Sequence, residues 1–184
     1  ITTNSFGGTR FKLEYYGLTD RSAELNRAAA ALSREAAGSD GLVIASIGPT
    51  GKMLMMEEVS AEEMYDAFKE QALALAEGGA DACLIETMTA LDEAVLAVRA
   101  VKENTGLEAV CTFTFERAIE GVHHTMMGVT PAQAAAALCD AGADIIGTNC
   151  SLGPDEMIGV VRALRAAAPD VPIIAQPNAG QPIA

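Results

Sequence analysis

Short apolar runs alternate along the chain with longer stretches in which apolar residues recur every three or four positions. The short runs have the length of strands and lack the polar alternation of a half-exposed strand. They cover residues 1–6, 42–47, 82–85, 109–115, 144–147 and 171–175. Uninterrupted runs of this kind are typical of parallel strands that are covered on both faces. The pattern therefore predicts an α/β protein with a parallel sheet.

The stretches between these runs carry residues that begin and end helices. Ser60 and Glu63 have the spacing of a capping box, and the helix that they open is expected to end at Gly78. Thr130 and Gln133 repeat the pattern, with a proline at the first helical position. The other boundaries that we expect are a start at Thr89 with an end near Gly106, a stop at Gly142, and a start at Pro154 with an end at Pro169.

Two helices show an apolar stripe that should face the sheet. The residues are Leu25, Ala28, Ala29, Leu32 and Ala36 in one helix, and Met157, Val160, Val161 and Leu164 in another.

The number of units favours a particular architecture. Six strands in 184 residues correspond to roughly 31 residues per βα unit, and a closed eight-fold (β/α)8 barrel needs about 250 residues. We therefore expect one domain over residues 1–184, a TIM barrel with about six of its eight units. An open flavodoxin-like sheet is the alternative, and it requires a reversal of strand order.

Composition excludes some classes of protein. Half of the residues are hydrophobic and the formal net charge is −13, which argues against binding to nucleic acid or to an anionic membrane. No apolar run approaches the length of a membrane span. The four cysteines form no C-x-x-C pair and no secretory signal is present, so a reducing cytoplasm is expected.

An internal repeat places the candidate chemistry. Residues 79–87 align without gaps on residues 142–150, so that Glu86 matches Asn149 and Thr87 matches Cys150. Both segments are a helix stop followed by a strand. The two pairs should therefore lie at one height at the carboxyl ends of their strands, where α/β barrels carry their active sites.

Polar clusters follow all six apolar runs, which suggests a functional rim rather than packing alone. Cys150 is either a reactive thiol held at a strand end or a small turn residue. Glu86 needs a partner at the end of an apolar run, either a ligand amine or a neighbouring Arg or Lys. The glycines of 48–52 and of 7–8 lack the spacing of phosphate-binding and dinucleotide-binding loops.

Five ordered motifs carry a family resemblance. They are residues 3–10 (TNSFGGTR), 46–51 (SIGPTG), 85–87 (IET), 147–151 (GTNCS) and 177–180 (PNAG). Together they resemble the homocysteine S-methyltransferase family, and within it the homocysteine-binding barrel of cobalamin-dependent methionine synthases.

The resemblance implies a barrel that binds zinc through three cysteine thiolates, with the homocysteine sulfur as a further ligand. Cys150 is similar to the first zinc cysteine, and Glu86 to the carboxylate that binds the homocysteine amino group. Asn178 resembles a residue that fills the open zinc position when homocysteine is absent. The residues expected to line the substrate pocket are Ser46, Ile47, Gly48, Glu86, Thr87 and Asn149.

The chain also departs from the family pattern. The other two zinc ligands of the family are an adjacent Cys-Cys pair after the seventh strand, which this sequence does not contain, and the first motif resembles the second strand. We therefore expect a domain truncated at both ends. Alone, it should bind zinc weakly or not at all and should transfer no methyl group.

The function implied is transfer of a methyl group from methylcobalamin to homocysteine thiolate, which gives methionine. Cobalamin and folate would be bound by other domains of the parent protein. The alternatives are a stand-alone methyltransferase that uses S-methylmethionine or betaine, a binding module for a thiol amino acid without turnover, and a barrel with no site.

Overall fold

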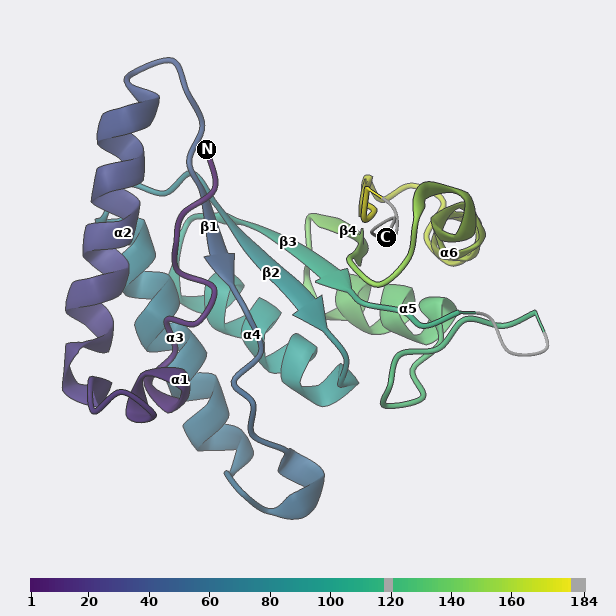
Figure 1. The fold of residues 1–184 in the computed structure, drawn as a ribbon, viewed down its shortest axis with the longest axis horizontal. Helices are drawn as coiled ribbons and strands as arrows, with labels where there is room; N and C mark the ends of the chain where they lie inside the picture. The colour runs from purple at the N-terminus through teal and green to yellow at the C-terminus, as the bar shows by residue number, and fades with distance from the viewer. Residues whose placement is uncertain (118–120, 180–184) are drawn as a thin grey trace, which may run out of the picture.

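Five parallel strands form one sheet in the computed structural model, which describes residues 1–117 and 121–179 (Figure 1). The strands are β1 (Ile44–Ile47), β2 (Ala82–Met88), β3 (Glu108–Phe113), β4 (Ile145–Asn149) and β5 (Ile173–Gln176). Their order in the sheet is their order in the chain, and every neighbouring pair is parallel. The predicted parallel α/β class is confirmed.

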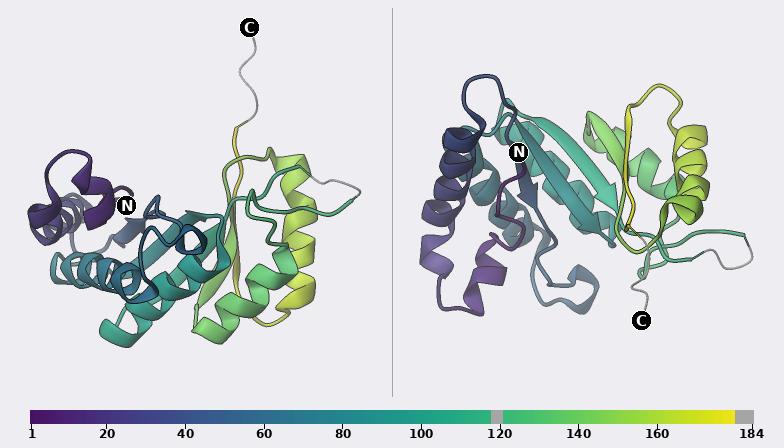
Figure 2. Two further views of the ribbon diagram at one scale, coloured as in Figure 1. Left: turned by 90° about the horizontal axis from the view of Figure 1, so that it is seen from below. Right: turned by 45° about the horizontal axis from the view of Figure 1, so that its top comes forward.

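The helices lie in an arc on one side of the curved sheet (Figure 2). They are α1 (Arg10–Glu14), α2 (Ser22–Ala37), α3 (Ala61–Glu77), α4 (Leu91–Asn104), α5 (Pro131–Ala141) and α6 (Pro154–Ala167), with 3₁₀ turns η1 (Thr19–Arg21) and η2 (Leu54–Met56). From α2 onward, each helix packs against the next one along the chain. A flavodoxin-like sheet needs a reversed strand order. The described strands show no reversal, so that alternative is wrong.

The first apolar run, residues 1–6, does not form the expected strand. It makes one isolated parallel bridge, between Thr2 and Ile44, although it does run alongside β1. A side chain interrupts the ladder: the Ser46 amide donates to Thr3 Oγ1 at 3.0 Å and not to a backbone carbonyl. The polar residues of this segment therefore replace strand pairing with side-chain hydrogen bonds.

Most helix boundaries follow the predicted caps. Ser60 and Thr130 each accept a hydrogen bond from the amide three residues on, and both capping boxes are complete. Thr89 is the exception, since α4 begins at Leu91 with Ala90 as its N-cap. The Thr89 carbonyl instead accepts a hydrogen bond from the Thr125 hydroxyl at 2.7 Å.

The core lies between the helices and the sheet and is largely aliphatic, with a few aromatic rings. Its largest fully buried members include Ile47, Phe68, Leu75, Ile85, Phe113 and Ile146. The stripe predicted on α6 is confirmed, because Met157, Val160 and Leu164 are buried.

The apolar stripe predicted on α2 is wrong. Leu32 is 67% exposed, and the buried face of the helix carries Ser22, Asn26 and Ala30. Asn26 can be buried there because its amide donates to two backbone carbonyls, Gly8 O at 2.7 Å and Ser22 O at 2.8 Å. Satisfied hydrogen bonds therefore decide which face of α2 packs inward.

Across the described ranges, no helix has both the length and the apolar character that crossing a bilayer requires.

Candidate functional site at the carboxyl ends of the strands

Asn149, the last residue of β4, joins three strand ends through its buried side chain. Its Oδ1 accepts hydrogen bonds from the Thr87 amide at 3.0 Å and from Thr112 Oγ1 at 2.8 Å. Its Nδ2 donates to Thr87 Oγ1 at 2.8 Å and to Cys150 Sγ at 3.2 Å. The amide therefore ties β2, β3 and the turn after β4 into one rim.

Two residues of this rim have a left-handed backbone conformation. Thr87 has φ 63° and Cys150 has φ 59°, and Ser151 continues the turn with φ 61°. Such conformations cost roughly 1–3 kcal/mol each for non-glycine residues and collect at functional sites. Thr87 lies in the irregular part of β2 between Ile85 and Met88, where the pairing with β3 changes register. This bulge turns the Glu86–Thr87 segment toward Asn149.

The repeat in the sequence is reproduced at the rim, but not residue for residue. Ile85 of β2 and Ile146 of β4 both pair with Cys111 of β3, so these two residues lie at the same height in the sheet. The sequence alignment instead matches Ile85 to Thr148, which lies two residues further along β4. Neighbouring strands of a curved parallel sheet are staggered, and the gap-free alignment could not include that stagger. The prediction that Glu86–Thr87 and Asn149–Cys150 lie at one height is therefore wrong, although the Thr87 amide does contact Asn149 Oδ1.

Glu86 is half-buried on the face of the sheet away from the helices. Its Oε1 accepts a hydrogen bond from the Ser46 hydroxyl at 2.5 Å. Among the described residues it forms no ion pair with Arg or Lys. A neighbouring Arg or Lys was one of the two partners expected for Glu86, and no such salt bridge is found in the described part of the chain. The carboxylate is therefore available to a ligand cation.

The segment before α1 supports this side of the rim. Ser5 Oγ donates to the Ser46 carbonyl at 2.7 Å, and the Gly48 amide donates to the Phe6 carbonyl at 2.9 Å. The Phe6 ring lies so close to Gly48 that a Cβ there would come within 2.6 Å of it. The Ile47 side chain points into the core, so only its backbone is available to a ligand.

Asn178 is exposed and lies beside the turn that carries Cys150. Its amide donates to the Leu152 carbonyl at 3.0 Å, and the Cys150 amide donates to the Gln176 carbonyl at 3.1 Å. The segment after β5 thus borders the turn after β4, as the assignment of both residues to one site requires.

Thr112 and Thr114 were not assigned to the site from the sequence. Thr114 Oγ1 donates to the Asn149 carbonyl at 3.0 Å, and Thr112 holds the Asn149 side chain. The available signal was the alternation of threonine with phenylalanine at the end of β3, which places both hydroxyls on one face of the strand.

The described residues do not complete a zinc site. No group of three or more His, Cys, Asp or Glu side chains that could hold a metal ion is found in residues 1–117 and 121–179. Cys83 and Cys111 are fully buried, and burial raises the pKa of the Cys83 thiol to about 12 and that of Cys111 likewise upward. Cys139 lies on α5. Exposed Cys150 is thus a single candidate ligand, whereas a catalytic zinc has three protein ligands.

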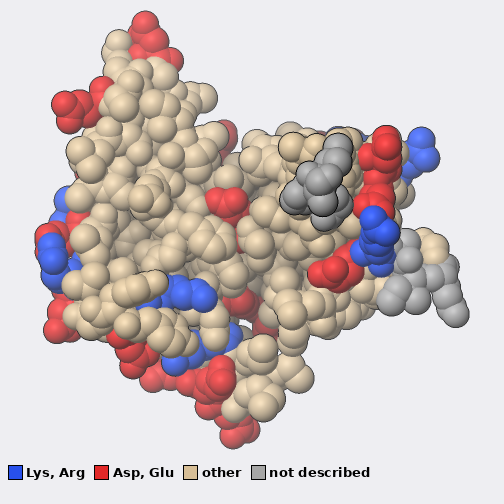
Figure 3. Space-filling view, in the orientation of Figure 1, with Lys and Arg blue, Asp and Glu red and all other residues tan. Residues whose placement is uncertain are grey.

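The charge around the site is consistent with the composition. Figure 3 shows acidic side chains spread over the visible face, with Lys and Arg only in small groups. This face offers no continuous basic patch that would attract a polyanion.

Comparison with known proteins supports the assignment of the chain to a family. The sequence profile of a family described as homocysteine S-methyltransferase matches residues 1–184. Methionine synthase from Mycobacterium tuberculosis (strain ATCC 25618 / H37Rv) is 32% identical over 192 residues, covering 100% of this chain and 16% of the relative. Betaine–homocysteine S-methyltransferase 1 from Danio rerio is 32% identical over 170 residues, covering 91% of this chain and 40% of the relative.

A solved structure shares the fold. The homocysteine methyltransferase MmuM from Escherichia coli, in its metallated form, superposes with a TM-score of 0.81 at 21% identity, covering 97% of this chain and 66% of MmuM. The chain thus spans less than two thirds of each of these proteins. Because the family profile covers the whole sequence, the chain belongs to the homocysteine S-methyltransferase family.

Proposed function

We propose that this chain is the homocysteine-binding part of a methyltransferase of the methionine synthase type. The observation that carries the proposal is Glu86, a half-buried carboxylate that the Ser46 hydroxyl holds at 2.5 Å and that no described Arg or Lys neutralises. An amino-acid ammonium group is a fitting partner for such a carboxylate, because charge-assisted hydrogen bonds are strong where water is partly excluded. Membership of the homocysteine S-methyltransferase family favours homocysteine as this amino acid.

The reaction requires a nucleophilic sulfur. A free thiol is mostly protonated at neutral pH, and the thiolate is the reactive form. Zinc, when bound, would supply a Lewis acid that favours the substrate thiolate. Cys150 is the described residue suited to hold it, and the other ligands would have to come from outside the described residues. The binding of the amino-acid end by Glu86 and Ser46 does not depend on a metal.

The fold that we propose for the intact domain is a (β/α)8 barrel, to which the described residues contribute five strands and the segment 1–6 that runs alongside β1. The sequential strand order and the one-sided helices support this, since each added βα unit continues the curvature toward closure. Methylcobalamin as methyl donor, with cobalamin and folate domains as partners, follows from the resemblance to methionine synthase. S-methylmethionine or betaine would serve if the parent protein were a stand-alone enzyme.

Calorimetric titration tests the proposal. We expect homocysteine to bind the chain with the same affinity in the presence and in the absence of zinc, because the described residues hold a single candidate zinc ligand. Glu86→Gln should weaken this binding at least about tenfold, because a charge-assisted hydrogen bond is lost. Ser46→Ala should have a smaller effect of the same sign. Glu108→Gln is the matched control, since Glu108 is exposed at the amino end of β3.

Three results distinguish the alternatives. In the intact parent protein, homocysteine binding that does not depend on zinc would favour a module that holds the amino acid without turnover. Equal affinities of the wild type and Glu86→Gln would contradict the proposed role of Glu86. Absence of binding to homocysteine and methionine under all conditions would favour a barrel without a site.

A further inference from the structure

A cavity of about 260 Å³ lies beside the Glu86–Cys150 rim and is not part of it. It is lined by the β1–α3 loop, by the segment from β2 into α4, and by the loop before α5, and it is open to solvent, since Met53, Met55 and Met126 are exposed. Five of the eight methionines of the chain line it: Met53, Met55, Met64, Met126 and Met127. Thr87 is the residue that the cavity shares with the rim, since neither Glu86, Ser46 nor Cys150 lines it.

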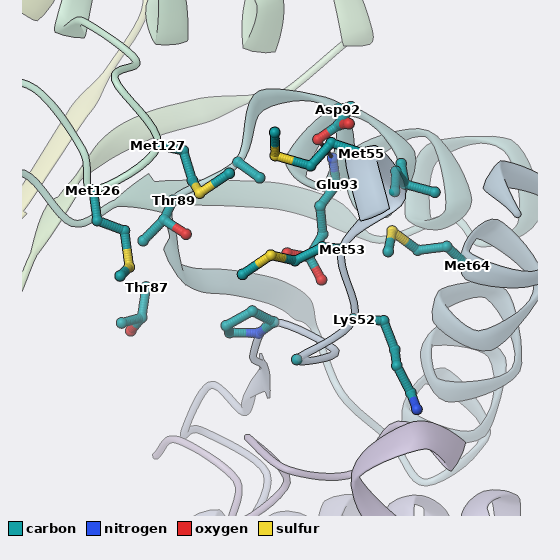
Figure 4. Close-up of a pocket in the computed structure, with 14 residues that line it drawn as sticks. Lys52, Met53, Met55, Met64, Thr87, Thr89, Asp92, Glu93, Met126 and Met127 are labelled. Carbon is teal, nitrogen blue, oxygen red and sulfur yellow. Dashed lines mark hydrogen bonds between the residues drawn. The ribbon is translucent and has the colours of Figure 1, made fainter. Parts of the chain in front are cut away.

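One buried carboxylate enters this apolar space. Glu93, in the first turn of α4, is only 5% exposed and lines the cavity (Figure 4). Its Oε1 accepts two hydrogen bonds from Thr50, one from the amide at 2.7 Å and one from the hydroxyl at 2.6 Å. Its Oε2 accepts no hydrogen bond from a described residue. An acceptor oxygen therefore remains for a ligand.

No described Lys or Arg forms an ion pair with Glu93, although the charge of Lys12, whose Nζ lies beside Gly51, acts to lower the pKa of Glu93. Lys52 lines the cavity, but its ammonium group points away from the methionines, toward Glu14 at 3.7 Å and the Phe11 ring (Figure 4). Asp92 adds a second negative charge at the mouth, where its Oδ1 accepts a hydrogen bond from the Glu93 amide at 2.8 Å. The cavity therefore favours a cation over an anion.

The lining also restricts the kind of cation and the group attached to it. Methionine side chains are flexible and polarizable, so they adapt to an apolar body of irregular shape. None of the described residues that line the cavity is aromatic, whereas quaternary ammonium groups are usually recognised by aromatic cages. A head group with N–H donors can instead hydrogen-bond to Glu93 Oε2 and to the Thr89 hydroxyl at the cavity wall.

We propose that this cavity is a second binding site, which takes a small protonated primary amine with an apolar body. The ammonium group binds Glu93, and the alkyl body lies among the five methionines. The site is separate from the amino-acid site at Glu86, so both can be filled at once, and its existence does not depend on homocysteine binding.

Methionine-methyl NMR tests this with the chain as it is, using n-hexylammonium chloride as the probe and n-hexanol as the neutral control of matched length. We expect saturable shifts of the methyl signals of Met53, Met55, Met64, Met126 and Met127, and none for Met157, which is buried on the core face of α6. Glu93→Gln should weaken hexylammonium binding at least about tenfold and leave hexanol binding unchanged. Glu86→Gln should change neither affinity.

A second variant keeps the test decisive if Glu93→Gln does not fold, which the core signals of Met88 and Met157 would reveal. Ala90→Leu places extra atoms in the cavity and leaves Glu93 intact, so it should weaken both probes. The proposal is overturned if the five methionine signals show no saturable shift, if hexylammonium and hexanol bind equally well, or if Ala90→Leu leaves both affinities unchanged.

Discussion

In the two repeated segments, the amino ends of β2 and β4 make the same contacts, whereas their carboxyl ends carry different side chains. At the amino ends, the repeated Gly-Ala-Asp sequence produces the same contact twice. Asp81 accepts a hydrogen bond from the Val43 amide at 2.6 Å and pairs with Arg34 of α2. Asp144 accepts one from the Ala109 amide at 2.8 Å and pairs with Lys102 at 2.8 Å. Each aspartate thus joins the preceding strand to a helix of the outer layer.

At the carboxyl ends, the repeated strands lead to different chemistry. β2 carries the carboxylate of Glu86 and a threonine, Thr87, with a left-handed backbone conformation. β4 ends with the amide of Asn149 and is followed by an exposed cysteine, Cys150, whose backbone is also left-handed. The backbone conformation at Thr87 and Cys150 is shared, and the side chains are not. The aspartates at the amino ends therefore hold neighbouring βα units together, and the side chains at the carboxyl ends can differ from unit to unit, as in barrel enzymes generally.

The largest difference should appear in thiol reactivity. Iodoacetamide should alkylate exposed Cys150 on the order of a thousandfold faster than buried Cys83 and Cys111, which become accessible only through local opening. Half-buried Cys139 should react at an intermediate rate, because burial raises its thiol pKa. Mass spectrometry of timed digests measures all four sites. Comparable rates for Cys150 and Cys111 would show that the carboxyl end of β4 is not open.

The second effect concerns the amide that joins the strand ends. Asn149→Ala should lower the free energy of unfolding by about 3 kcal/mol, since it leaves the half-buried Thr87 amide and the buried Thr112 hydroxyl without partners. Asn4→Ala, at an exposed residue, should change it by less than about 0.5 kcal/mol. Urea unfolding followed by circular dichroism compares the two. Equal midpoints would mean that Asn149 is not what holds the rim.

A smaller effect should appear at the amino ends as the pH falls. The hydrogen bond from the Val43 amide and the Arg34 pair lower the pKa of Asp81. Burial acts to raise the pKa of Asp144, but the Lys102 pair and the hydrogen bond from the Ala109 amide together outweigh it, so that the net shift is also downward. A lowered pKa in the folded state adds stability above the unfolded value, about 3.9, and this stability is lost as pH falls through the folded value.

Asp144→Asn should remove the part of the acid-induced loss of stability that comes from Asp144. At neutral pH the variant should be less stable than the wild type by less than about 1 kcal/mol, because the pair with Lys102 is partly exposed. Thermal unfolding between pH 2 and 7 gives the comparison. An acid transition as steep in the variant as in the wild type would argue against the contact at the amino end.

The smallest effect should come from Glu93, near the carboxyl end of β2, and its contribution to stability should change with pH in the opposite direction to that of the aspartates. Burial raises the pKa of Glu93, against the hydrogen bonds from Thr50. The folded state then keeps a proton that the unfolded state has released, so this contribution is complete below the unfolded pKa and is lost as pH rises through the folded one. Glu93→Gln should flatten the stability profile above about pH 4.3. A profile unchanged in this range would indicate that Glu93 is better solvated than its burial suggests.

Much of this architecture could be predicted from local sequence. The caps at Ser60 and Thr130 depend on residues three apart, and the apolar runs depend on neighbours, so both caps and five of the six expected strands were predicted correctly. The face of α2 could not be, because the burial of Asn26 depends on a carbonyl of the loop before α1, 18 residues away. The strand expected at residues 1–6 failed for a similar reason, since the amide of Ser46 pairs with the Thr3 side chain, 43 residues distant.

The sequence by itself determined the alternation of strands and helices, the family, and the placement of Glu86 and Cys150 at strand ends, because periodicity, turn residues and ordered motifs are local properties. Only the tertiary structure decided the stagger of the repeats, the joining of three strand ends by Asn149, and the assembly of the methionine-lined cavity beside Glu93. These features depend on contacts such as Thr87 with Asn149, 62 residues apart, and Thr50 with Glu93, 43 residues apart. Such contacts arise only when separate βα units pack side by side.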